Sequence, residues 1–553
     1  MLWIDCSWGQ RRSRCSGNTI EAAPVTRRTA NDGGRVSDLT DMVAFRTDAS
    51  TRLGIGHVMR CLALADRLTS IAIMSIFFCR ELPEALKGRL ERHGHRVHLF
   101  GDASTPAGEV AEIAQAIREL PNRPKTLVCD HYERDGTWQA RLRDVVERLV
   151  VIDDLANRSH DCDLLVDPSV DRRPEDYSGL VPGEAIVLTG TRFAMLRPEF
   201  ALLREQTTVE AAATVRSPPS RIVVSMGGSD EPNATGYVLT ALDALEPAIR
   251  DTLHIDVVVG GGCPHVPKLR EQADRLGLNI TLHVDTEDLA DILASSDLAF
   301  GASGGSSWER CCLGVPTITL VLADNQRYIA ERLAGHGAVI NLGTWPDISH
   351  ESIRAAFLSL HGNTAALAEM RTAALAICDG QGTRRVVEAI VGYRMTSGQA
   401  IALRPALADD AETLFRFQSA PGARAHSRNP EPPSWEGHCA WFARRLSQSC
   451  SPFYMVMAGD VVVGMVRLDR RSADEEEYEV SILIDPAWHG QGLGLASLRL
   501  LRLRHPGLQI VANVSPKNRA SQAVFRRAGY VKVSPDWYEL RANSPGIGKR
   551  GAS

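Results

Sequence analysis

Several kinds of pattern are missing from this sequence of 553 residues. Its 12 cysteines include no CxxC pair, and no His/Cys cluster has zinc spacing, so neither a disulfide framework nor a metal site is expected. No run of 18 uninterrupted apolar residues occurs, and the N-terminus lacks an apolar core of signal-peptide length. We therefore expect a soluble, cytoplasmic protein with reduced thiols and no membrane partner.

An excess of basic residues is also missing. The 62 Lys and Arg residues face 67 Asp and Glu, which gives a formal net charge of −5. A surface that binds polyanions needs the opposite balance, so no nucleic-acid partner is expected. Only 6% of the residues are aromatic, while 44% are hydrophobic and 23% are charged, which is typical of a globular protein rather than a disordered or fibrous one.

The length favours three or four domains. Residues 1–41 are rich in Arg, Ser, Thr, Gly and Asp and show no periodicity, so we expect them to form a disordered tail. An apolar strand pattern begins abruptly at Met42, and translation is expected to start either at Met1 or at Met42.

Residues 42–206 and 220–395 are predicted to form two similar α/β halves. In each, six nearly continuous apolar runs alternate with amphipathic stretches, the pattern of a parallel sheet covered on both faces. The predicted strands lie within 42–48, 71–79, 96–101, 125–132, 148–154 and 185–190, and within 221–230, 255–262, 280–286, 298–305, 317–322 and 338–343. Two Rossmann-like halves in series, separated by a polar link at Thr207–Pro219, predict a ligand cleft between them.

Residues 400–541 are predicted to form a smaller α+β domain. A hairpin over 453–468 turns at Gly459 and Asp460, a strand follows over 478–485, and a glycine-rich segment then enters a helix. We expect this domain to have its own core, joined to the second half near Tyr393–Ile401. The segment after Arg541 is expected to fray.

The first chemical motif is Gly54-Ile55-Gly56-His57. Apolar residues with helical spacing follow it, so the glycines lie in a strand-to-helix turn and His57 stands at or near the helix N-terminus. Free N–H groups there attract phosphate, and the helix dipole disfavours a protonated imidazole, which would keep His57 neutral and able to act as a base. The alternative is a glycine turn whose histidine only caps the helix.

Seven motifs in order resemble one family. They are residues 46–50, 54–65, 129–132, 191–200, 225–233, 301–318 and 323–326. Together they resemble the UDP-2,4-diacetamido-2,4,6-trideoxy-β-L-altropyranose hydrolases of pseudaminic acid synthesis, which are related to proteins of the glycosyltransferase-B fold. The resemblance covers about Met42 to Tyr393.

That resemblance implies roles for residues of the first half. His57 would activate the water that displaces UDP at the anomeric carbon with inversion, and Asp130, His131 and Tyr132 would act beside it on the sugar. The other residues placed in the substrate site are Arg46, Asp48, Gly54 and Gly56. Alternatively, Tyr132 is a packed aromatic side chain and Asp130 caps the turn that follows.

The second half would hold the nucleotide. Two glycine turns that follow strands leave the backbone open to a diphosphate, and they are made by Gly227, Gly228 and Ser229 and by Gly304, Gly305 and Ser306. By resemblance, Glu309 would hold the ribose hydroxyls, and Asn325 and Gln326 would face the sugar or diphosphate. The alternative for each glycine cluster is a tight turn without a ligand.

Residues 488–496 follow a strand and open a helix with several glycines, an arrangement that suits a pyrophosphate. They resemble the acetyl-CoA loop of the GNAT N-acetyltransferases, and residues 518–530 resemble the second signature of that family, so the match spans about Ile401 to Leu540. The implied acetyl-CoA-binding residues are Ile482, Leu483, Ile484, His489, Gly490, Gln491, Gly492, Leu493, Gly494, Asn513, Asn518 and Ser521.

Two positions depart from the GNAT pattern. His489 stands where the family usually has Arg or Gln, and Phe525 stands where many members carry the tyrosine that protonates the departing thiolate. Because phenylalanine has no proton to give, another acid, water or no acid must serve. Glu479 is the candidate for removing a proton from the amine, and the alternative is a solvated residue beside the acidic run 474–477.

These resemblances imply two consecutive reactions on one chain. The acetyltransferase would acetylate the 4-amino group of a UDP-4-amino sugar, and the hydrolase would then remove UDP. The alternatives are an inverting glycosyltransferase or a UDP-N-acetylglucosamine 2-epimerase-like enzyme, and a non-catalytic nucleotide-sugar sensor. A histidine at the helix start favours hydrolysis over mere binding, and the lack of a basic-aromatic membrane face argues against a glycosyltransferase with a lipid acceptor.

Overall fold

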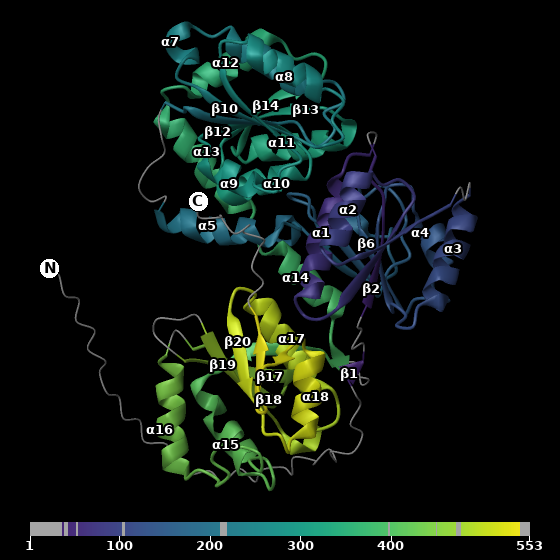
Figure 1. Ribbon diagram of the computed structural model, residues 1–553, viewed down its shortest axis with the longest axis vertical. Helices are drawn as coiled ribbons and strands as arrows, with labels where there is room; N and C mark the ends of the chain where they lie inside the picture. Colours follow the sequence, from purple (N-terminus) through teal and green to yellow (C-terminus); the bar gives the residue numbers. More distant parts are fainter. Residues whose placement is uncertain are drawn as a thin grey trace, which may run out of the picture.

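The structure is a computed structural model that describes eight stretches of the chain. They are residues 36–37, 42–50, 53–101, 105–210, 218–395, 399–448, 451–471 and 477–541. Most of the predicted tail, the middle of the link Thr207–Pro219 and the segment after Arg541 lie outside these stretches. Figure 1 shows three lobes: the first half in purple and blue, the second half in teal at the top, and the C-terminal lobe in green and yellow at the bottom.

Seven parallel strands form the sheet of the first half. In their order of pairing they are β4 (Arg96–Leu99), β3 (Met74–Cys79), β2 (Met42–Thr47), β5 (Thr126–Asp130), β6 (Arg148–Ile152), β7 (Leu164–Asp167) and β8 (Ile186–Thr189). Helices α1 (Gly56–Thr69) and α2 (Glu84–Arg92) cover one face, and α3 (Pro106–Glu119) and α4 (Gly136–Ala140) cover the other. Strands β2 and β5 are therefore buried along their whole length.

The prediction of six strands in this half is wrong, because the sheet has a seventh strand, β7. It has only four residues, and acidic side chains flank it at Asp163 and Asp167. Such a short apolar run between charges carries no recognisable strand period, so the sequence pattern missed it. It pairs with both β6 and β8 and completes the sheet.

Six parallel strands form the sheet of the second half, as predicted. Their order is β11 (Asn279–Val284), β10 (His254–Val259), β9 (Arg221–Ser225), β12 (Leu298–Ala302), β13 (Thr317–Val321) and β14 (Val339–Thr344). One face is covered by α6 (Ala234–Asp243), α8 (Val266–Arg275) and α12 (His350–Leu360). The other face is covered by α9 (Leu289–Ser295), α10 (Ser306–Leu313) and α11 (Arg327–Gly335).

Three helices lie where the chain passes from one half to the other and back. Helix α5 (Pro198–Glu210) leaves the first half and packs on α9 and α10. Helix α13 (Thr364–Ile377) also packs on α10, and α14 (Gly382–Val391) then returns to pack on α1. Part of the segment 220–395 thus contributes to the core of the first half.

In both sheets the strand order reverses at one point. The reversal lies between β2 and β5 in the first half and between β9 and β12 in the second. Ligands of open α/β sheets bind beyond the carboxyl ends of the strands at such a reversal. The loops that follow these four strands carry most of the residues expected to bind substrate.

The C-terminal lobe is built on a mixed seven-stranded sheet. Its order is β16 (Ile401–Pro405), β17 (Phe453–Ala458), β18 (Val461–Arg470), β19 (Glu477–Ile484), β20 (Gln509–Asn513), β22 (Trp537–Leu540) and β21 (Val531–Lys532). All neighbouring strands are antiparallel except β19 and β20. Helices α15 (Ala411–Ser419) and α16 (Trp435–Leu446) pack on one face, and α17 (Leu493–Arg504) and α18 (Arg519–Arg527) on the other. The predicted fold class, two Rossmann-like halves followed by an α+β domain, is confirmed.

The C-terminal lobe has one core cluster of its own, under α15 and α16, but on the other face of its sheet it shares a hydrophobic core with the first half, so the cores are not separate as expected. Leu68 of α1, Val387 of α14 and Leu501 of α17 belong to the same buried cluster. Helix α17 is buried around its whole circumference from Leu495 to Leu503, because one side packs on its own sheet and the other on α14.

Two arginines cross this boundary in opposite directions. The Arg67 guanidinium of α1 donates to the carbonyl of Leu503 at the end of α17. Arg499 of α17 donates to the carbonyl of Ala72, just after α1, at 3.2 Å. Each lobe thus supplies a cation to a carbonyl group at or just after the C-terminal end of the other lobe's helix, where a positive charge is favourable.

A short strand lies inside the predicted tail. Strand β1 (Val36–Ser37) pairs antiparallel with β15 (Arg394–Met395), which follows α14. These two residues are therefore ordered in the structure, unlike the expectation for the whole of 1–41.

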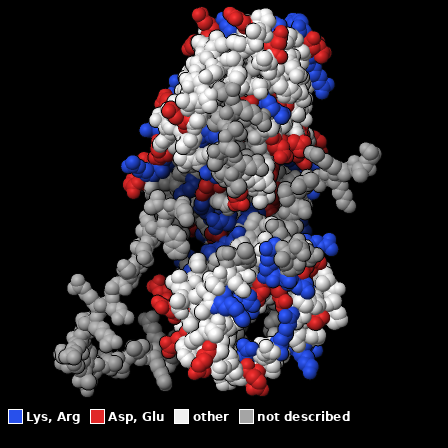
Figure 2. Space-filling view, turned by 90° about the vertical axis from the view of Figure 1, so that its left-hand side faces the viewer, with Lys and Arg blue, Asp and Glu red and all other residues white. Residues whose placement is uncertain are grey.

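Figure 2 shows that Lys and Arg side chains gather in the hollow between the upper and lower parts of the molecule.

Candidate active sites

His57 stands at the second position of α1, and its ring is bonded to Asp130 rather than to the helix end. The helix begins at Gly56, and Ile55 caps it without a side-chain hydrogen bond. His57 Nδ1 lies 2.7 Å from Asp130 Oδ1 at the end of β5. His57 is only 8% exposed and Asp130 is fully buried. The capping alternative is therefore not what the structure shows, and His57 is more buried than a surface helix-start residue.

The charge of Asp130 fixes the tautomer of His57. Burial alone would raise the pKa of Asp130, but the charges of Arg60 and His57 and their hydrogen bonds outweigh it, so the pKa lies well below its usual range. An ionised carboxylate only accepts hydrogen bonds, so Nδ1 is the donor. Nε2 then carries the lone pair that a general base needs, and no hydrogen bond among the described residues occupies it.

Tyr132 joins this pair to the second half. Its ring packs edge-on against His57, with 4.6 Å between the ring centroids, and its hydroxyl accepts from Asn325 Nδ2 at 3.2 Å. Asn325 belongs to the turn η3 (Asp324–Gln326) after β13. The structure thus brings together His57, Asp130, Tyr132 and Asn325, which are distant in sequence.

The two glycine-bearing loops also meet across the halves. A Cβ at Gly228 would lie 2.8 Å from the side chain of Ile55, so a larger residue here would force Ile55 to shift. Gly54 has φ +74° and bonds back to the carbonyl of Ser50, and Gly56 begins α1 with open space around its Cα. The turn before His57 therefore faces the turn after β9.

Arg46, Asp48 and His131 lie in a separate buried network. Arg46 is fully buried and donates to Glu109 at 2.6 Å and to Asp48 at 2.8 Å. His131 Nε2 lies 3.1 Å from Asp48, and its Nδ1 accepts from the backbone N–H of Glu133 at 3.0 Å. Both nitrogens of His131 and the polar groups of Arg46 and Asp48 are thus engaged with protein, so these three residues support the loops around His57 instead of facing a ligand.

In the second half, the two predicted glycine turns follow β9 and β12. Gly227 has φ +98°, which favours glycine, and Ser229 follows Gly228 in the same turn. Gly305 caps α10 with its backbone only, and Ser306 is the first residue of that helix. A Cβ on Gly304 would lie 4.0 Å from Gln326 Nε2, while Gln326 Oε1 accepts from the N–H of Leu322. Both turns leave backbone exposed at the carboxyl end of the sheet.

Glu309 lies one turn into α10 and is partly buried. No hydrogen bond or ion pair within the described stretches is recorded for its carboxylate. Burial raises the pKa of Glu309, and nearby Arg197 and Arg310 oppose this rise. The neighbouring Arg310 is hydrogen-bonded within the loop, because it donates to the carbonyl of Ala302 and to the hydroxyls of Ser306 and Ser307. Glu309 is thus free to accept hydrogen bonds from a ligand.

In the C-terminal lobe, β19 and β20 separate after a short parallel pairing. They pair only from Glu477 to Glu479 with Gln509 to Val511, although β19 continues to Ile484. The backbone of Ile482, Leu483 and Ile484 therefore has no β20 partner on that side, and residues 482–484 are half-buried. Such a gap between parallel strands suits an amide-bearing ligand arm.

The glycine-rich loop follows directly. Gly490 and Gly492 have φ +78° and +86°, and Gly492 caps α17 ahead of Leu493 and Gly494. Gln491 is buried between them, and its Oε1 has no hydrogen-bond partner among the described residues. A helix N-terminus with freed amides and an unsatisfied buried amide group fits the pyrophosphate and pantetheine of a coenzyme A thioester.

The other expected coenzyme residues are engaged with protein. His489 is exposed and its Nε2 lies 2.9 Å from the carbonyl of Ile484. Asn513 donates to Asp536 at 3.2 Å, and Asn518 caps α18 by accepting from the N–H of Ser521 at 3.0 Å. Phe525 is buried against Tyr530, so its ring belongs to the core of the lobe.

Glu479 lies at the point where the two strands part. It faces Asp469 across β18 and β19 and forms an ion pair of 2.8 Å with Arg428, which is 62% exposed. Because its partner is a solvent-exposed side chain, the carboxylate remains accessible at the edge of the gap. Glu479 can act as a base at this position once its ion pair with Arg428 opens.

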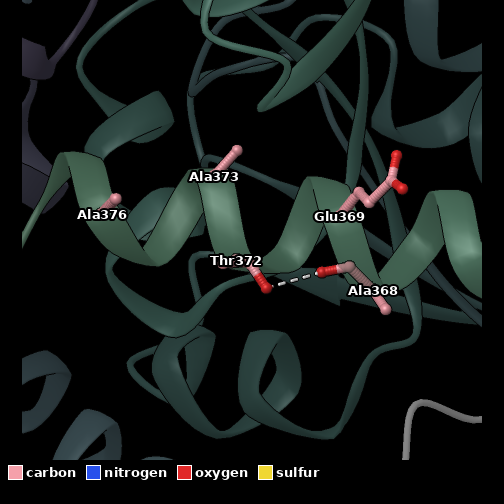
Figure 3. A pocket seen from close by; sticks show the side chains of 5 residues that line it. All are labelled: Ala368, Glu369, Thr372, Ala373 and Ala376. Carbon is pink, nitrogen blue, oxygen red and sulfur yellow. Dashed lines mark hydrogen bonds between the residues drawn. The ribbon is translucent and has the colours of Figure 1, made fainter.

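The structure shows a further depression on α13, outside both sites. It is lined by Ala368, Glu369, Thr372, Ala373 and Ala376 (Figure 3). Small apolar side chains dominate it, and none of the predicted site residues takes part. Within the described stretches, no helix is long and apolar enough to cross a membrane, and no cluster of His, Cys, Asp and Glu is arranged to hold a metal.

Arg60 is not among the site residues predicted from the sequence. It lies on α1 three residues after His57, donates to both oxygens of Asp130 at 2.6 Å and reaches Asp154 at 2.9 Å. The sequence does contain a signal for it, because the spacing of three between His57 and Arg60 places both side chains on one face of a helix. Without the fold, nothing showed that both face the end of β5.

Comparison with known proteins divides the chain in the same way. Residues 401–531 match the family model of the acetyltransferase (GNAT) domain. An uncharacterised protein of Methanocaldococcus jannaschii is 21% identical over 510 residues, which cover 89% of this chain and 97% of that protein.

The UDP-2,4-diacetamido-2,4,6-trideoxy-β-L-altropyranose hydrolase of Campylobacter jejuni is 26% identical over 297 residues, or 53% of this chain and 97% of the hydrolase. Among solved structures, Acinetobacter baumannii MurG matches 63% of this chain and 99% of its own, with 16% identity and a TM-score of 0.44. The chain is thus homologous to the hydrolase over half of its length and carries a GNAT domain at its C-terminal end. The resemblance found from the motifs is confirmed.

Proposed function

We propose that residues 42–395 hydrolyse UDP-2,4-diacetamido-2,4,6-trideoxy-β-L-altropyranose to UDP and the free sugar, as a step of pseudaminic acid synthesis. One observation carries the proposal: the 2.7 Å contact between His57 Nδ1 and buried Asp130, at the point where Tyr132 and Asn325 join the two halves. The homology with the C. jejuni hydrolase over this region supports it.

In this proposal His57 acts as the general base. With Nδ1–H donating to Asp130, Nε2 accepts a proton from a water molecule, and the water oxygen bonds to the anomeric carbon. The bond between that carbon and the diphosphate oxygen breaks, and its electron pair leaves with UDP. Because water attacks opposite the leaving group, the configuration at the anomeric carbon inverts.

The second half would hold the UDP part. The turns at Gly227–Ser229 and Gly304–Ser306 would bind the diphosphate through backbone N–H groups, and the unpaired Glu309 would accept from the ribose hydroxyls. Asn325 and Gln326 would then lie between the diphosphate and Tyr132. In this proposal the second half binds the nucleotide, and the first half supplies the general base.

We further propose that the C-terminal lobe acetylates the 4-amino group of the UDP-amino-sugar precursor with acetyl-CoA. The amine nitrogen attacks the thioester carbonyl, Glu479 takes a proton from the amine, and the thiolate leaves. Since Phe525 has no proton to give, the thiolate takes its proton from solvent. The nine cysteines that the structure describes are free, which fits the reducing cytoplasm where we place both reactions.

The test is to incubate the purified full chain with UDP-4-amino and UDP-diacetamido sugars, with and without acetyl-CoA, in water enriched in oxygen-18. Mass analysis should show that the diacetamido sugar releases UDP without acetyl-CoA, with the heavy oxygen in the sugar. Without acetyl-CoA, the 4-amino sugar should release no UDP. It should show one added acetyl group on the 4-amino sugar only when acetyl-CoA is present. Heavy oxygen in UDP, a 2-epimer or binding without a product would each contradict the proposal.

A further inference from the structure

Arg60 holds the buried carboxylate of Asp130 from α1, beside His57 and Cys61 of the same helix, whose Sγ lies 3.6 Å from Asp130 Oδ2. Its Nε donates to Asp130 Oδ2 and its Nη2 to Asp130 Oδ1, both at 2.6 Å. The guanidinium thus holds both oxygens in the planar two-bond geometry that Arg forms with carboxylates. Its remaining nitrogen, Nη1, is anchored by Asp154 at 2.9 Å, so the group cannot rotate freely.

The guanidinium and the imidazole share one oxygen atom. Asp130 Oδ1 accepts from His57 Nδ1 at 2.7 Å and from Arg60 Nη2 at 2.6 Å, and the two nitrogens lie 3.1 Å apart. A positive charge so close to the ring disfavours a second proton on it. It also compensates the charge of Asp130, which would otherwise favour the imidazolium form.

The groups that face His57 come from three elements. Arg60 lies on α1, Asp130 ends β5, Tyr132 follows β5, and Asp154, which follows β6, pairs with Arg60 and acts on Tyr132 by its charge. Tyr132 contributes no charge, because burial raises its pKa. The two charged groups in hydrogen-bond contact with the ring are therefore one anion, Asp130, and one cation, Arg60, and Asp154 lies behind the guanidinium.

We propose that Arg60 is a positioning residue of the hydrolase site: it holds Asp130 in the orientation that fixes the tautomer of His57 and keeps the imidazole neutral and able to accept a proton. The role deepens the proposed function, since it assumes that His57 is the base. A purely structural ion pair would stabilise the loops without moving the protonation equilibrium of His57. The two roles therefore differ in a measurable way.

The direction of the effect follows from the charges. In Arg60→Met the anion remains and the cation is gone, so the imidazolium form is stabilised and the titration midpoint of His57 rises. In Asp130→Asn the cation remains and the anion is gone, so the midpoint falls. Opposite shifts from two residues that bind each other are not expected from a general loss of structure.

The experiment is an NMR titration of the full chain labelled with ¹³C at histidine, in which the signal of His57 is identified by its loss in His57→Gln. We expect the midpoint to rise by about one pH unit or more in Arg60→Met and to fall in Asp130→Asn. Arg143→Gln is the matched control, because Arg143 binds Asp161 and Asp163 in the same half, away from His57. It should leave the midpoint unchanged.

The kinetic readout is the pH profile of kcat/KM for UDP release. The acid limb should move to higher pH in Arg60→Met, with activity recovering as the pH rises. Loss of activity by the same factor at every pH, or an unchanged His57 midpoint, would overturn the proposal. If no UDP is released by the unaltered protein, the proposed function fails, while the titration still decides the role of Arg60.

Arg60→Lys covers the case in which Arg60→Met does not fold, as judged by circular dichroism. Lysine keeps the charge but cannot hold both oxygens, so we expect a midpoint near that of the unaltered protein and a plateau of kcat/KM roughly tenfold lower. A plateau equal to that of the unaltered protein would show that the two-bond geometry is not needed, and it would overturn the proposed positioning role.

Discussion

The imidazole of His57 is largely buried, and within the described stretches a hydrogen bond engages its Nδ1 but none engages its Nε2. Burying a polar atom without a hydrogen bond costs free energy, so such atoms are usually satisfied in a folded protein. Here Nδ1 is bonded to Asp130 and only Nε2 is left for a ligand or water. At the scale of single residues, this available nitrogen distinguishes His57 from the neighbouring His131, both of whose nitrogens are hydrogen-bonded.

His57→Ala should lower the rate of UDP release by at least about 10²-fold, because it removes the base, while UDP binding changes little. The fold should survive, since Asp130 keeps both hydrogen bonds to Arg60. UDP release is measured by a coupled assay and UDP affinity by calorimetry. His98→Ala is the control, because His98 is half-exposed and bonded only to Glu112 within the described stretches. UDP release within a few fold of normal in His57→Ala would remove His57 from the mechanism.

The buried network under the site makes stability depend on pH. Burial would raise the pKa of Asp48, but hydrogen bonds from His131 and Arg46 and the Arg46 charge lower it below its usual range. A lowered pKa means that the unfolded chain binds the proton first, so this stabilisation is present above about pH 4 and is lost as the pH falls towards the folded pKa.

In Asp48→Asn the fall in unfolding free energy between pH 6 and pH 3 should therefore be smaller by about 1 kcal/mol. Urea unfolding followed by tryptophan fluorescence measures this difference. Asp130 and Glu109 also have lowered pKa values and are unchanged, so some pH dependence must remain. An equal fall in both proteins would show that Asp48 does not contribute.

At the scale of secondary structure elements, α10 joins the glycine turn after β12 to the carboxylate of Glu309. Contacts to a ribose are made equally in the ground state and the transition state, so they affect KM rather than kcat. We expect Glu309→Ala to raise KM for the UDP-sugar by about tenfold and to leave kcat within about twofold. Glu369→Ala is the control, since Glu369 is exposed on α13 (Figure 3). An unchanged KM in Glu309→Ala would make Glu309 structural.

The strands that position the sites could be predicted because they are buried on both faces and carry nearly continuous apolar runs, as β2 and β9 do. Strand β7 could not, because three apolar residues between Asp163 and Asp167 are too few to show a strand period. The contact between Tyr132 and Asn325 depends on how the two halves pack, and sequence spacing carries no information on that. Arg60 had the right spacing from His57, but its ion pair with Asp130 appears only once β5 is placed beside α1.

For the whole molecule, the shared core decides how the domains depend on each other. The chain 42–395 expressed alone would expose the face of α1 and α14 that α17 covers, and the Arg67 and Arg499 contacts would be lost. We expect this fragment to unfold at least about 5 °C below the full chain, because several buried apolar side chains lose their partners. Co-expression with 399–541 should restore the melting temperature. A fragment as stable as the full chain would show that the shared core contributes little.

A point substitution therefore separates the two activities more cleanly than truncation. A Cβ on Gly494 would make only an ordinary contact of 3.6 Å with Val524, so the start of α17 tolerates a side chain while a tryptophan there fills the space in front of the loop. We expect Gly494→Trp to abolish acetylation of the UDP-4-amino sugar and to hydrolyse the diacetamido sugar within about twofold of normal, since its contacts with α1 and α14 are kept. Gly507→Ala, a glycine with open space in the turn after α17, is the control for both activities.

Mixing Gly494→Trp with His57→Ala then tests the order of the reactions. Each variant keeps one activity, so the mixture should convert the UDP-4-amino sugar to free acetylated sugar if the acetylated intermediate is released and rebound. Because the hydrolase and acetyltransferase loops lie at the far ends of α1 and α17 from their Arg67–Leu503 contact, no residue need be shared between the two reactions. A full chain that converts the substrate while the mixture does not would mean that the intermediate passes directly between the sites. Equal hydrolysis of the unacetylated sugar by Gly494→Trp would contradict the order itself, because the hydrolase would not need the product of its neighbour.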